Sequence, residues 1–381
     1  MAKKIVVIGG GIAGLSAAQA AATTDKDASV LLICGEKKLP YYRPRICEVF
    51  SGLDVEKLNV HSEQWFIDNK IELIFQMVQE IDPETKQLRF VGVEEQLTYD
   101  KLIIATGAVG NRPEAEGTAT DNVLALRFLA DINRVRRYPG PVVVIGGGLL
   151  GLEAAWHLSC EGRQVVIIER GERLLMRQLD EEASRFFLHI VENAGIRVAL
   201  NGSLEAIRNG QVILSDSRGF PAAVTIFAAG IKPQIALAQA AGLQCNRAIV
   251  VDAMMATSAD DIYACGDCAE FNGFVPGLWT VSMAQGTVAG KNAVGGEESY
   301  TPEEPPYMMN AMGTRIWSGG NITLEESVTR SFPADGKFYK LFFNDKGQLS
   351  GAILIGEIGK SIALKKAIAN RMNRTEALEL I

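Results

Sequence analysis

The chain carries the same glycine-rich pattern twice, and this duplication limits the possible folds more than any other feature. VVIGGGIAGLSAA occupies residues 6–18 and VVVIGGGLLGLEAAWHL occupies residues 142–158. The copies align without a gap, which matches Gly9 with Gly146, Gly11 with Gly148, and Gly14 with Gly151. Each copy follows β-branched residues and leads into an alanine-rich run, a pattern that predicts strand, tight turn and helix.

The three glycines of such a turn have separate tasks. The first permits the turn, the second lets a pyrophosphate approach the backbone, and the third lets the helix pack closely on the strand. The N-terminus of the helix then faces the phosphates.

An acidic residue closes the next apolar run in both copies. Glu36 ends VLLICGE and Glu169 ends VVIIE. A carboxylate at this point accepts hydrogen bonds from a ribose diol. The sequence therefore predicts two dinucleotide sites, one for a resident redox cofactor and one for a nucleotide that binds and leaves.

A hydrophobic content of 48% with 38 glycines fits a soluble α/β protein with many tight turns. A chain of 381 residues exceeds one ordinary core, which indicates two or three domains. The net charge of −7 and the pI near 5.3 argue against nucleic acid as the main partner. Six scattered cysteines form no disulfide framework, which favours a reducing cytosol.

The first residues imitate a secretory signal, because MAKK precedes an apolar run. A signal peptide does not need three spaced glycines or an acid at residue 36, so a strand with its phosphate turn explains these residues better. No other apolar run reaches about 18 residues. We expect a cytoplasmic protein without a membrane span.

The order of the motifs predicts one nucleotide domain inserted into another. Apolar strands end at Thr106-Gly107 and again at Ala229-Gly230, where the backbone can pass close to a cofactor. The expected division is a first nucleotide domain of residues 1–109 and 230–297, a second of residues 110–229, and a C-terminal domain of residues 298–381. The expected fold class is α/β, with two Rossmann-like domains and a small α+β domain.

These residues resemble the pyridine nucleotide-disulfide oxidoreductase superfamily, which binds FAD and NAD(P)H, over nearly the whole chain. Within it, the run LPYYRPRICEVFSG and the short C-terminal part resemble the NADH:rubredoxin oxidoreductase group, which includes rubredoxin and flavorubredoxin reductases. The resemblance implies a bound FAD and NADH as the electron donor.

The resemblance also assigns a flavin site. Arg43 would contact the phosphates, Asp267 would bond the ribityl chain, and the helix starting at Trp279 would stabilise the negative charge of the reduced ring. The alternatives are a solvated loop arginine at 43, a plain strand residue at 78, a surface arginine at 127 and a core aromatic at 279. The expected FAD residues are Gly9, Gly11, Ala13, Gly14, Glu36, Arg43, Val78, Thr106, Gly107, Arg127, Gly266, Asp267, Trp279 and Thr280.

The second turn is implied to be the NADH site. Its expected residues are Gly146, Gly148, Gly151 and Glu169, and Gly230 is expected to bring the backbone close to a cofactor. The carboxylate at 169 would repel a 2′-phosphate and so favours NADH over NADPH, a preference that Arg170 and Arg173 weaken without reversing.

Two residues are expected to act in catalysis, Trp279 and Glu153. In relatives a glutamate at position 153 lies near the meeting point of flavin and nicotinamide, whereas a first-turn acid favoured by the helix dipole is the alternative. Relatives often have lysine where this chain has Glu48, which removes the partner of Glu153 and leaves its role open.

The cysteines raise two competing interpretations. Cys265 and Cys268 form a CxxC around Gly266-Asp267, which invites a dithiol mechanism but also suits a strand end that binds flavin. Cys47 follows Glu36 by eleven residues, at a plausible helix start that would lower its pKa, as in thiol-dependent NADH oxidases, peroxidases and CoA-disulfide reductases. No metal-ligand spacing occurs, so no metal is expected.

The hypothesis is an FAD-dependent NADH oxidoreductase that reduces rubredoxin or flavorubredoxin, as a monomer or a homodimer. The alternatives are a thiol enzyme that uses Cys47 and a non-catalytic flavoprotein that senses redox state. An acidic partner needs a basic surface on this acidic chain. The candidates are a basic C-terminal helix containing Lys360, Lys365, Lys366, Arg371 and Arg374, and a cluster of Arg134, Arg136 and Arg137. A solvated face is the alternative explanation for either cluster.

Overall fold

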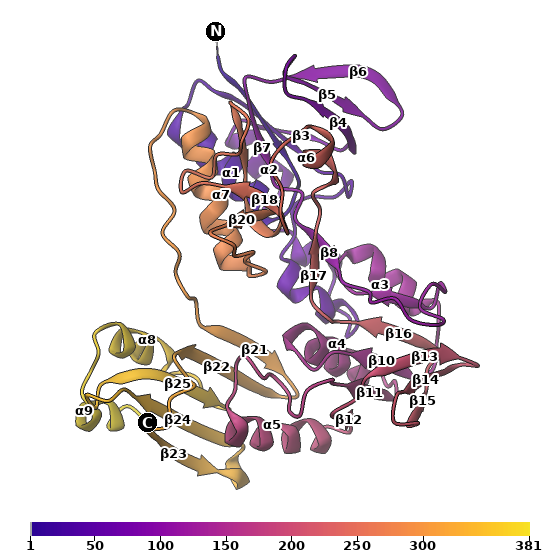
Figure 1. The fold of residues 1–381 in the computed structure, drawn as a ribbon, viewed down its shortest axis with the longest axis vertical. Helices are drawn as coiled ribbons and strands as arrows, with labels where there is room; N and C mark the ends of the chain where they lie inside the picture. Colours follow the sequence, from indigo (N-terminus) through magenta and orange to yellow (C-terminus); the bar gives the residue numbers. More distant parts are fainter. Residues whose placement is uncertain (1) are drawn as a thin grey trace. The chain divides into compact units, whose positions relative to one another are not determined.

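The structure is a computed structural model that describes residues 2–381 in two compact units (Figure 1). The first unit contains residues 2–46, 54–109 and 231–303. The second contains residues 47–53, 110–230 and 304–381. The chain leaves the first unit through β8 (Ala108–Gly110) and returns through β17 (Ile231–Pro233), and these two strands pair.

The first unit is built on a five-stranded parallel sheet. Its strands are continuous apolar runs, as expected for a sheet covered on both faces. In sheet order they are β19 (Ile262–Ala264), β7 (Lys101–Ile104), β1 (Lys4–Ile8), β2 (Ser29–Ile33) and β3 (Ile71–Ile74). Smaller elements of this unit are β4 (Val78–Asp82), β5 (Gln87–Phe90), β6 (Val93–Thr98), β18 (Ile249–Val251), β20 (Ala269–Phe271), α2 (Glu63–Asp68), α6 (Ala236–Ala240), η2 (Val55–Leu58) and η3 (Gly266–Cys268).

Two helices of this unit pack unusually closely, α1 (Ile12–Thr24) and α7 (Trp279–Ala293). A Cβ at Gly286 would lie 2.2 Å from the carbonyl oxygen of Ala13, and one at Gly290 would lie 2.1 Å from that of Ala17. Glycine is therefore required at both positions for the helix backbones to meet.

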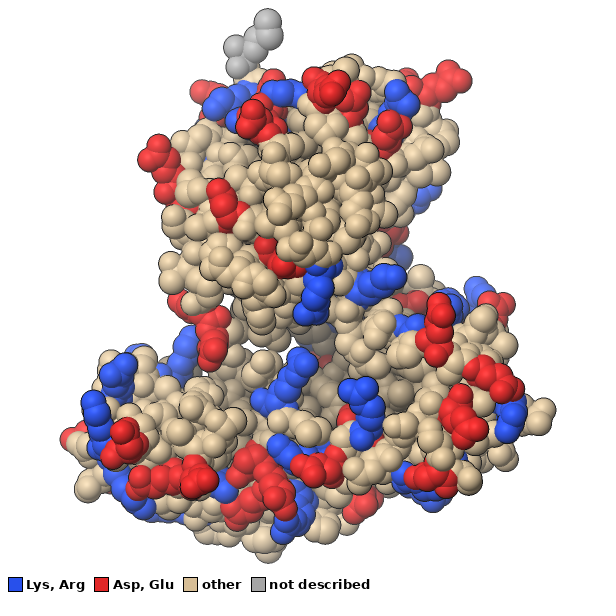
Figure 2. Space-filling view, viewed as in Figure 1, with Lys and Arg blue, Asp and Glu red and all other residues tan. Residues whose placement is uncertain are grey.

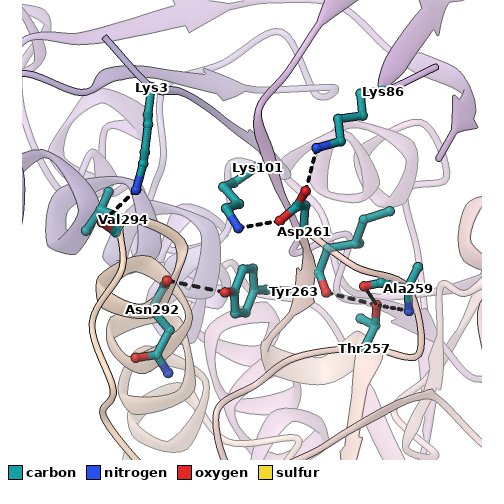
Figure 3. A network of polar contacts seen from close by, with 10 residues as sticks. Lys3, Lys86, Lys101, Thr257, Ala259, Asp261, Tyr263, Asn292 and Val294 are labelled. Atoms are coloured by element: carbon teal, nitrogen blue, oxygen red, sulfur yellow. Dashed lines mark hydrogen bonds and ion pairs between the residues drawn. The ribbon is translucent and has the colours of Figure 1, made fainter. Parts of the chain in front are cut away.

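A polar network ties the other end of α7 to the sheet (Figure 3). The Tyr263 hydroxyl, on β19, donates to the carbonyl oxygen of Asn292 at 3.2 Å. Next to it, Asp261 forms ion pairs with Lys86 and Lys101. The Tyr263 contact ties the C-terminal end of α7 to β19, and the ion pairs tie the start of β19 to Lys86 and to β7.

The second unit repeats the parallel sheet. Its strands in sheet order are β12 (Arg197–Ala199), β11 (Val165–Ile168), β10 (Val142–Ile145), β16 (Val224–Phe227) and β9 (Val123–Ala125). Its helices are α3 (Leu129–Arg136), α4 (Leu149–Cys160) and α5 (Glu181–Asn193), and a three-stranded sheet adds β13 (Leu204–Arg208), β14 (Gln211–Leu214) and β15 (Gly219–Pro221). The 3₁₀ helix η1 (Arg43–Val49) begins in the first unit and ends in the second.

The last part of the second unit is an antiparallel sheet with its own core. In sheet order it contains β21 (Tyr307–Ala311), β22 (Thr314–Gly320), β25 (Leu349–Ile355), β24 (Lys337–Phe343) and β23 (Ser327–Phe332), with η4 (Pro333–Asp335) before β24. The basic helix expected here is in fact two helices, α8 (Ser361–Ala369) and α9 (Arg374–Leu378). Arg371 interrupts it, because its φ of 50° lies in the left-handed region.

The predicted fold class is confirmed: two Rossmann-like parallel sheets are joined to a C-terminal region with an antiparallel sheet. No helix in residues 2–381 is long and apolar enough to cross a membrane.

Candidate dinucleotide sites

The first glycine turn has the strand–turn–helix context that the sequence predicts, between β1 and α1. Gly9 has a φ of 122°, and a Cβ there would lie 2.1 Å from the carbonyl oxygen of Ala105. A Cβ at Gly14 would lie 1.9 Å from the carbonyl oxygen of Gly9. At Gly11, by contrast, a Cβ would meet no atom within 4 Å. Gly9 and Gly14 are therefore required because a side chain there would collide with the backbone, whereas Gly11 borders open space.

The second turn, between β10 and α4, repeats this geometry. Gly146 has a φ of 120°, and its Cβ would lie 2.5 Å from the carbonyl oxygen of Ala228. The Cβ of a residue at Gly151 would lie 2.0 Å from the carbonyl oxygen of Gly146, and Gly148 again borders open space. The two turns are thus copies in structure as well as in sequence.

The helices that follow the turns have no side-chain caps. Gly11 and Gly148 are the N-cap residues of α1 and α4, and neither helix has an acid in its first turn. On α5, by contrast, the side chain of Asp180 accepts a hydrogen bond from the amide of Ala183. The first amides of α1 and α4 are therefore available to an anion, which fits a pyrophosphate.

Glu36 lies just beyond β2 with both carboxylate oxygens bonded to side chains. Tyr41 donates its hydroxyl to Oε2 at 2.7 Å, and Arg43 donates Nη2 to Oε1 at 2.8 Å. Arg43 also donates to the Tyr41 hydroxyl at 2.8 Å and lies over its ring. Arg43 is therefore not a solvated loop arginine, because the first acid, the tyrosine and the arginine form one bonded group.

The strand ends of the first unit place Thr106, Gly107, Gly266 and Asp267. The Thr106 hydroxyl donates a hydrogen bond to the backbone carbonyl oxygen of Gln234 at 2.7 Å. The side-chain amide of Gln234 in turn donates to the backbone carbonyl oxygen of Thr106 at 2.9 Å. Gly107 and Gly266 have φ values of 68° and 76°, so both positions favour glycine. The Asp267 carboxylate is buried and accepts from Ser282 of α7 at 3.2 Å.

The helix α7 begins at Trp279, followed by Thr280, as the sequence predicts. It has no side-chain cap and no acid in its first turn. The Trp279 ring contacts Tyr42, with the two centroids 4.7 Å apart. The N-terminus of α7 therefore carries an uncapped positive dipole end, and the rings of Trp279 and Tyr42 lie beside it.

Val78 is buried at the start of β4, where it pairs with Phe90. Its neighbour Met77 lies close to Gly35, because a Cβ at Gly35 would be 3.2 Å from the Met77 sulfur. Val78 thus follows a residue that contacts Gly35, which precedes Glu36.

The second acid is held differently from the first. Glu169 accepts from the amides of Gly147 and Gly171, one on each carboxylate oxygen, both at 2.6 Å. Backbone amides fix its position without neutralising it with a cation. Gly230 follows the end of β16 with a φ of 89°, and its carbonyl oxygen accepts from the Asn111 amide at 2.9 Å.

Arg127 belongs to the second unit, unlike the other expected flavin residues. It lies between β9 and α3, and its amide donates to the buried carboxylate of Asp131 at 2.9 Å. Burial of Asp131 and this contact place Arg127 in an ordered turn at the start of α3.

Glu153 lies on α4 in a carboxyl-rich environment within the second unit. Burial, and after it the charge of Glu48, raise the pKa of Glu153 to about 8. One turn further along α4, His157 Nδ1 lies 2.7 Å from the hydroxyl of Ser51. A buried carboxyl with this pKa holds its proton at neutral pH.

The prediction that Cys47 lies at a helix start with a lowered pKa is wrong. Cys47 lies inside η1 rather than at a helix start, and only 1% of it is exposed. Burial raises its pKa well above the usual value, and the charges of Glu153 and Glu48 raise it further. The thiolate that a redox enzyme requires is therefore disfavoured at this position.

The CxxC pair is equally unsuited to dithiol chemistry. Cys265 and Cys268 are completely buried, and burial raises the pKa of both thiols. The Cys268 thiol donates to backbone carbonyl oxygens of Ile104 and Cys265. Both side chains therefore fill space at the end of β19.

The sequence did not single out several residues that organise the first site. Tyr41 and Tyr42 stand in the YYRP run, but only the fold shows that one binds Glu36 and the other packs on Trp279. Gln285 is buried on α7, where its side chain accepts from the Gly266 amide at 2.9 Å. The sequence signal for Gln285 was its polar side chain within the run of small residues that forms α7.

Comparison with known protein families gives two matches. Residues 3–286 match the pyridine nucleotide-disulphide oxidoreductase family. Residues 305–372 match the rubredoxin NAD+ reductase C-terminal domain. The two matches together account for nearly the whole chain.

Individual proteins are similar along the full length. The NADH-rubredoxin oxidoreductase of Clostridium acetobutylicum is 33% identical over 372 residues, covering 96% of this chain and 94% of that protein. A crystal structure of the NADH:rubredoxin oxidoreductase from this organism has a TM-score of 0.79 at 29% identity and covers 98% of this chain and 96% of that chain. The structure of an NAD-dependent persulfide reductase from A. fulgidus has a TM-score of 0.87 at 29% identity and covers 97% of this chain but 77% of its own.

Proposed function

The chain belongs to the pyridine nucleotide-disulphide oxidoreductase family, and from this premise we propose that it is an FAD-dependent NADH oxidoreductase. Its electrons go to a small one-electron redox protein, rubredoxin or a flavorubredoxin. This agrees with the resemblance stated from the motifs, which the family matches confirm.

The observation that carries the proposal is the repeated phosphate cradle. Both turns have two glycines that the backbone requires, one glycine that borders open space, an uncapped helix and an acid after the next strand. A protein that held one dinucleotide would need this geometry once. Two cradles fit an enzyme that binds a resident flavin nucleotide and a visiting pyridine nucleotide.

The first cradle is proposed to hold FAD. When bound, a flavin takes up two electrons from NADH and passes them on one at a time, which an iron centre requires. Arg43 neutralises Glu36 and presents a cation close to the phosphates, while Asp267 offers acceptors to the ribityl hydroxyls. The uncapped N-terminus of α7 stabilises negative charge by about 1 kcal/mol.

The second cradle is proposed to take NADH in preference to NADPH. Two backbone amides hold Glu169, so the position of its carboxylate is fixed. It accepts hydrogen bonds from a ribose diol and repels a 2′-phosphate. Arg173 pairs with Glu172 at 2.7 Å, which reduces its value as a phosphate ligand.

The proposal for the acceptor is supported by the C-terminal region. Residues 305–372 match a domain of rubredoxin NAD+ reductases, and the similar protein of Clostridium acetobutylicum is named an NADH-rubredoxin oxidoreductase. Reduction of peroxide, oxygen or CoA disulfide through a reactive thiol is disfavoured, because Cys47, Cys265 and Cys268 are buried.

A panel of acceptors tests the function. The purified protein, saturated with FAD, is supplied with NADH and with rubredoxin, ferredoxin, hydrogen peroxide, CoA disulfide or oxygen. We expect the largest kcat/KM with rubredoxin and at least about tenfold less with the others. Rapid turnover with peroxide or CoA disulfide and none with rubredoxin would overturn the proposed acceptor.

A further inference from the structure

The helix α8 presents an apolar spot bordered by lysines on its outer face. Leu364 and Ala367 are buried and pack into the core of the C-terminal region. The residues on the other side, at spacings of three, four and seven, are Ile362, Lys365, Lys366 and Ala369, all exposed; we call them the α8 face. Ile362 is 72% exposed, more than any other large apolar side chain of residues 2–381.

The charge around the α8 face is opposite to that of the whole chain. Residues 358–375 contain no acid and five cations, whereas the complete chain has a net charge of −7; Glu357 and Glu376 flank this stretch, and Arg374 pairs with Glu326. Figure 2 shows blue side chains, with red ones beside them, over the end of the C-terminal region that carries α8 and α9. A local positive field of this kind attracts a negatively charged protein and raises its association rate.

The lysines of the α8 face differ in their contacts from the second basic cluster of the chain, Arg134, Arg136 and Arg137. On α3, Arg136 donates to the carbonyl oxygen of Val49 at 2.7 Å and lies 3.5 Å from Glu161, and Arg134 lies 3.8 Å from Asp131. Within residues 2–381, neither Lys365 nor Lys366 forms an ion pair. Arg134 and Arg136 thus have partners inside the protein, as Arg374 has in Glu326, whereas Lys365 and Lys366 are available to a partner.

We propose that the α8 face is a docking surface for a small acidic electron-carrier protein of the rubredoxin type. This inference rests on the proposed function. An apolar centre with a charged border is the usual composition of a transient interface: the apolar contact excludes water and the charges steer the approach. Ile362 supplies the centre, and Lys365 and Lys366 meet acidic residues on the partner.

The test reverses the two charges in the FAD-loaded enzyme. The variant Lys365→Glu/Lys366→Glu is compared with wild type and with Lys26→Glu/Lys346→Glu, which has the same net charge but changes exposed lysines elsewhere. Steady-state kinetics use NADH with rubredoxin or with ferricyanide, at low and high ionic strength. A third variant, Ile362→Ser, removes the apolar centre. All four positions and Ile362 are exposed, so folding is preserved.

We expect the α8 double variant to raise the KM for rubredoxin about tenfold at low ionic strength, with ferricyanide turnover unchanged. The difference shrinks at high salt, because the steering is screened. The control variant keeps a KM within about twofold of wild type. Ile362→Ser raises the KM at both ionic strengths.

Two results would overturn the docking surface while leaving the proposed function intact. One is a rubredoxin KM that the α8 variant and the control change equally. The other is a large effect from reversing Arg134 on α3 and Arg137, which follows it, together with none from α8. A wild-type enzyme that fails to reduce ferricyanide with NADH contradicts the proposed function itself.

Discussion

The ammonium group of Lys340, on β24, lies 2.6 Å from the carboxylate of Asp180, the N-cap residue of α5. It also lies 2.7 Å from Glu182, which accepts a further hydrogen bond from Thr329 at 2.9 Å. Next to this group, the rings of Phe186 and Phe338 are 5.3 Å apart. One largely buried lysine therefore joins the antiparallel sheet to the second nucleotide-binding region within a single unit.

Lys340→Met is expected to lower the free energy of unfolding by about 2 kcal/mol, because Asp180 and Glu182 lose their cation while both remain in contact with solvent. Denaturant unfolding measures the change. Lys337→Met is the matched control on the same strand, since its partner Glu357 is exposed and the pair is worth less than about 1 kcal/mol. Equal losses for the two variants would show that the Lys340 contacts add nothing.

Gly11→Val and Gly148→Val should separate the two nucleotide sites. Both glycines have extended backbone and border open space, so valine is tolerated by the fold and obstructs only the ligand. We expect Gly11→Val to weaken FAD binding by at least about tenfold, measured by flavin content and fluorescence titration. Gly148→Val should keep its flavin and raise the KM for NADH by a similar factor. Loss of flavin from the Gly148 variant would contradict the assignment.

Glu153 predicts a pH dependence of stability. The unfolded chain loses this proton near its ordinary pKa of 4.5, whereas the folded protein keeps it to about 8. The contribution of Glu153 is therefore fully present at low pH, and stability falls as the pH rises through this window.

Glu153→Gln keeps the shape of the protonated carboxyl and removes its titration. In the flavin-free protein, we expect this variant to be more stable than wild type at about pH 8 and equally stable at about pH 4. Thermal unfolding across the pH range measures both. A stability difference that does not change with pH would show that Glu153 titrates normally.

Cys47→Ser should leave NADH oxidation with rubredoxin or ferricyanide within about twofold of wild type, because the buried thiol takes no part in the reaction. A loss of about a hundredfold or more with any acceptor, in a variant that retains its flavin and its unfolding temperature, would restore the thiol mechanism.

The repeated motif made the two sheets and both turns predictable from the sequence. Glycine at positions 9, 14, 146 and 151 is required by backbone contacts that the spacing alone encodes. The acids at 36 and 169 were found in the same way, because each closes the strand that follows the turn.

The partners of those acids were not predictable. Tyr41 and Arg43 bind Glu36, whereas backbone amides bind Glu169, and nothing in the local sequence distinguishes the two arrangements. The environment of Cys47 was also hidden, since the pKa of its thiol depends on burial and on the charge of Glu153, which is more than a hundred residues away. The basic helix was expected as one element because composition does not reveal the left-handed turn at Arg371.

We propose that FAD bound at the first glycine turn is reduced by NADH bound at the second. Anaerobic mixing of FAD-loaded protein with one equivalent of NADH tests it directly, with the visible flavin absorbance followed in a stopped-flow instrument. We expect rapid loss of the yellow absorbance, and a much slower reaction with NADPH. A protein that binds no FAD, or one whose bound flavin stays oxidised with excess NADH, would contradict the account; the second result is the one that a non-catalytic sensor gives.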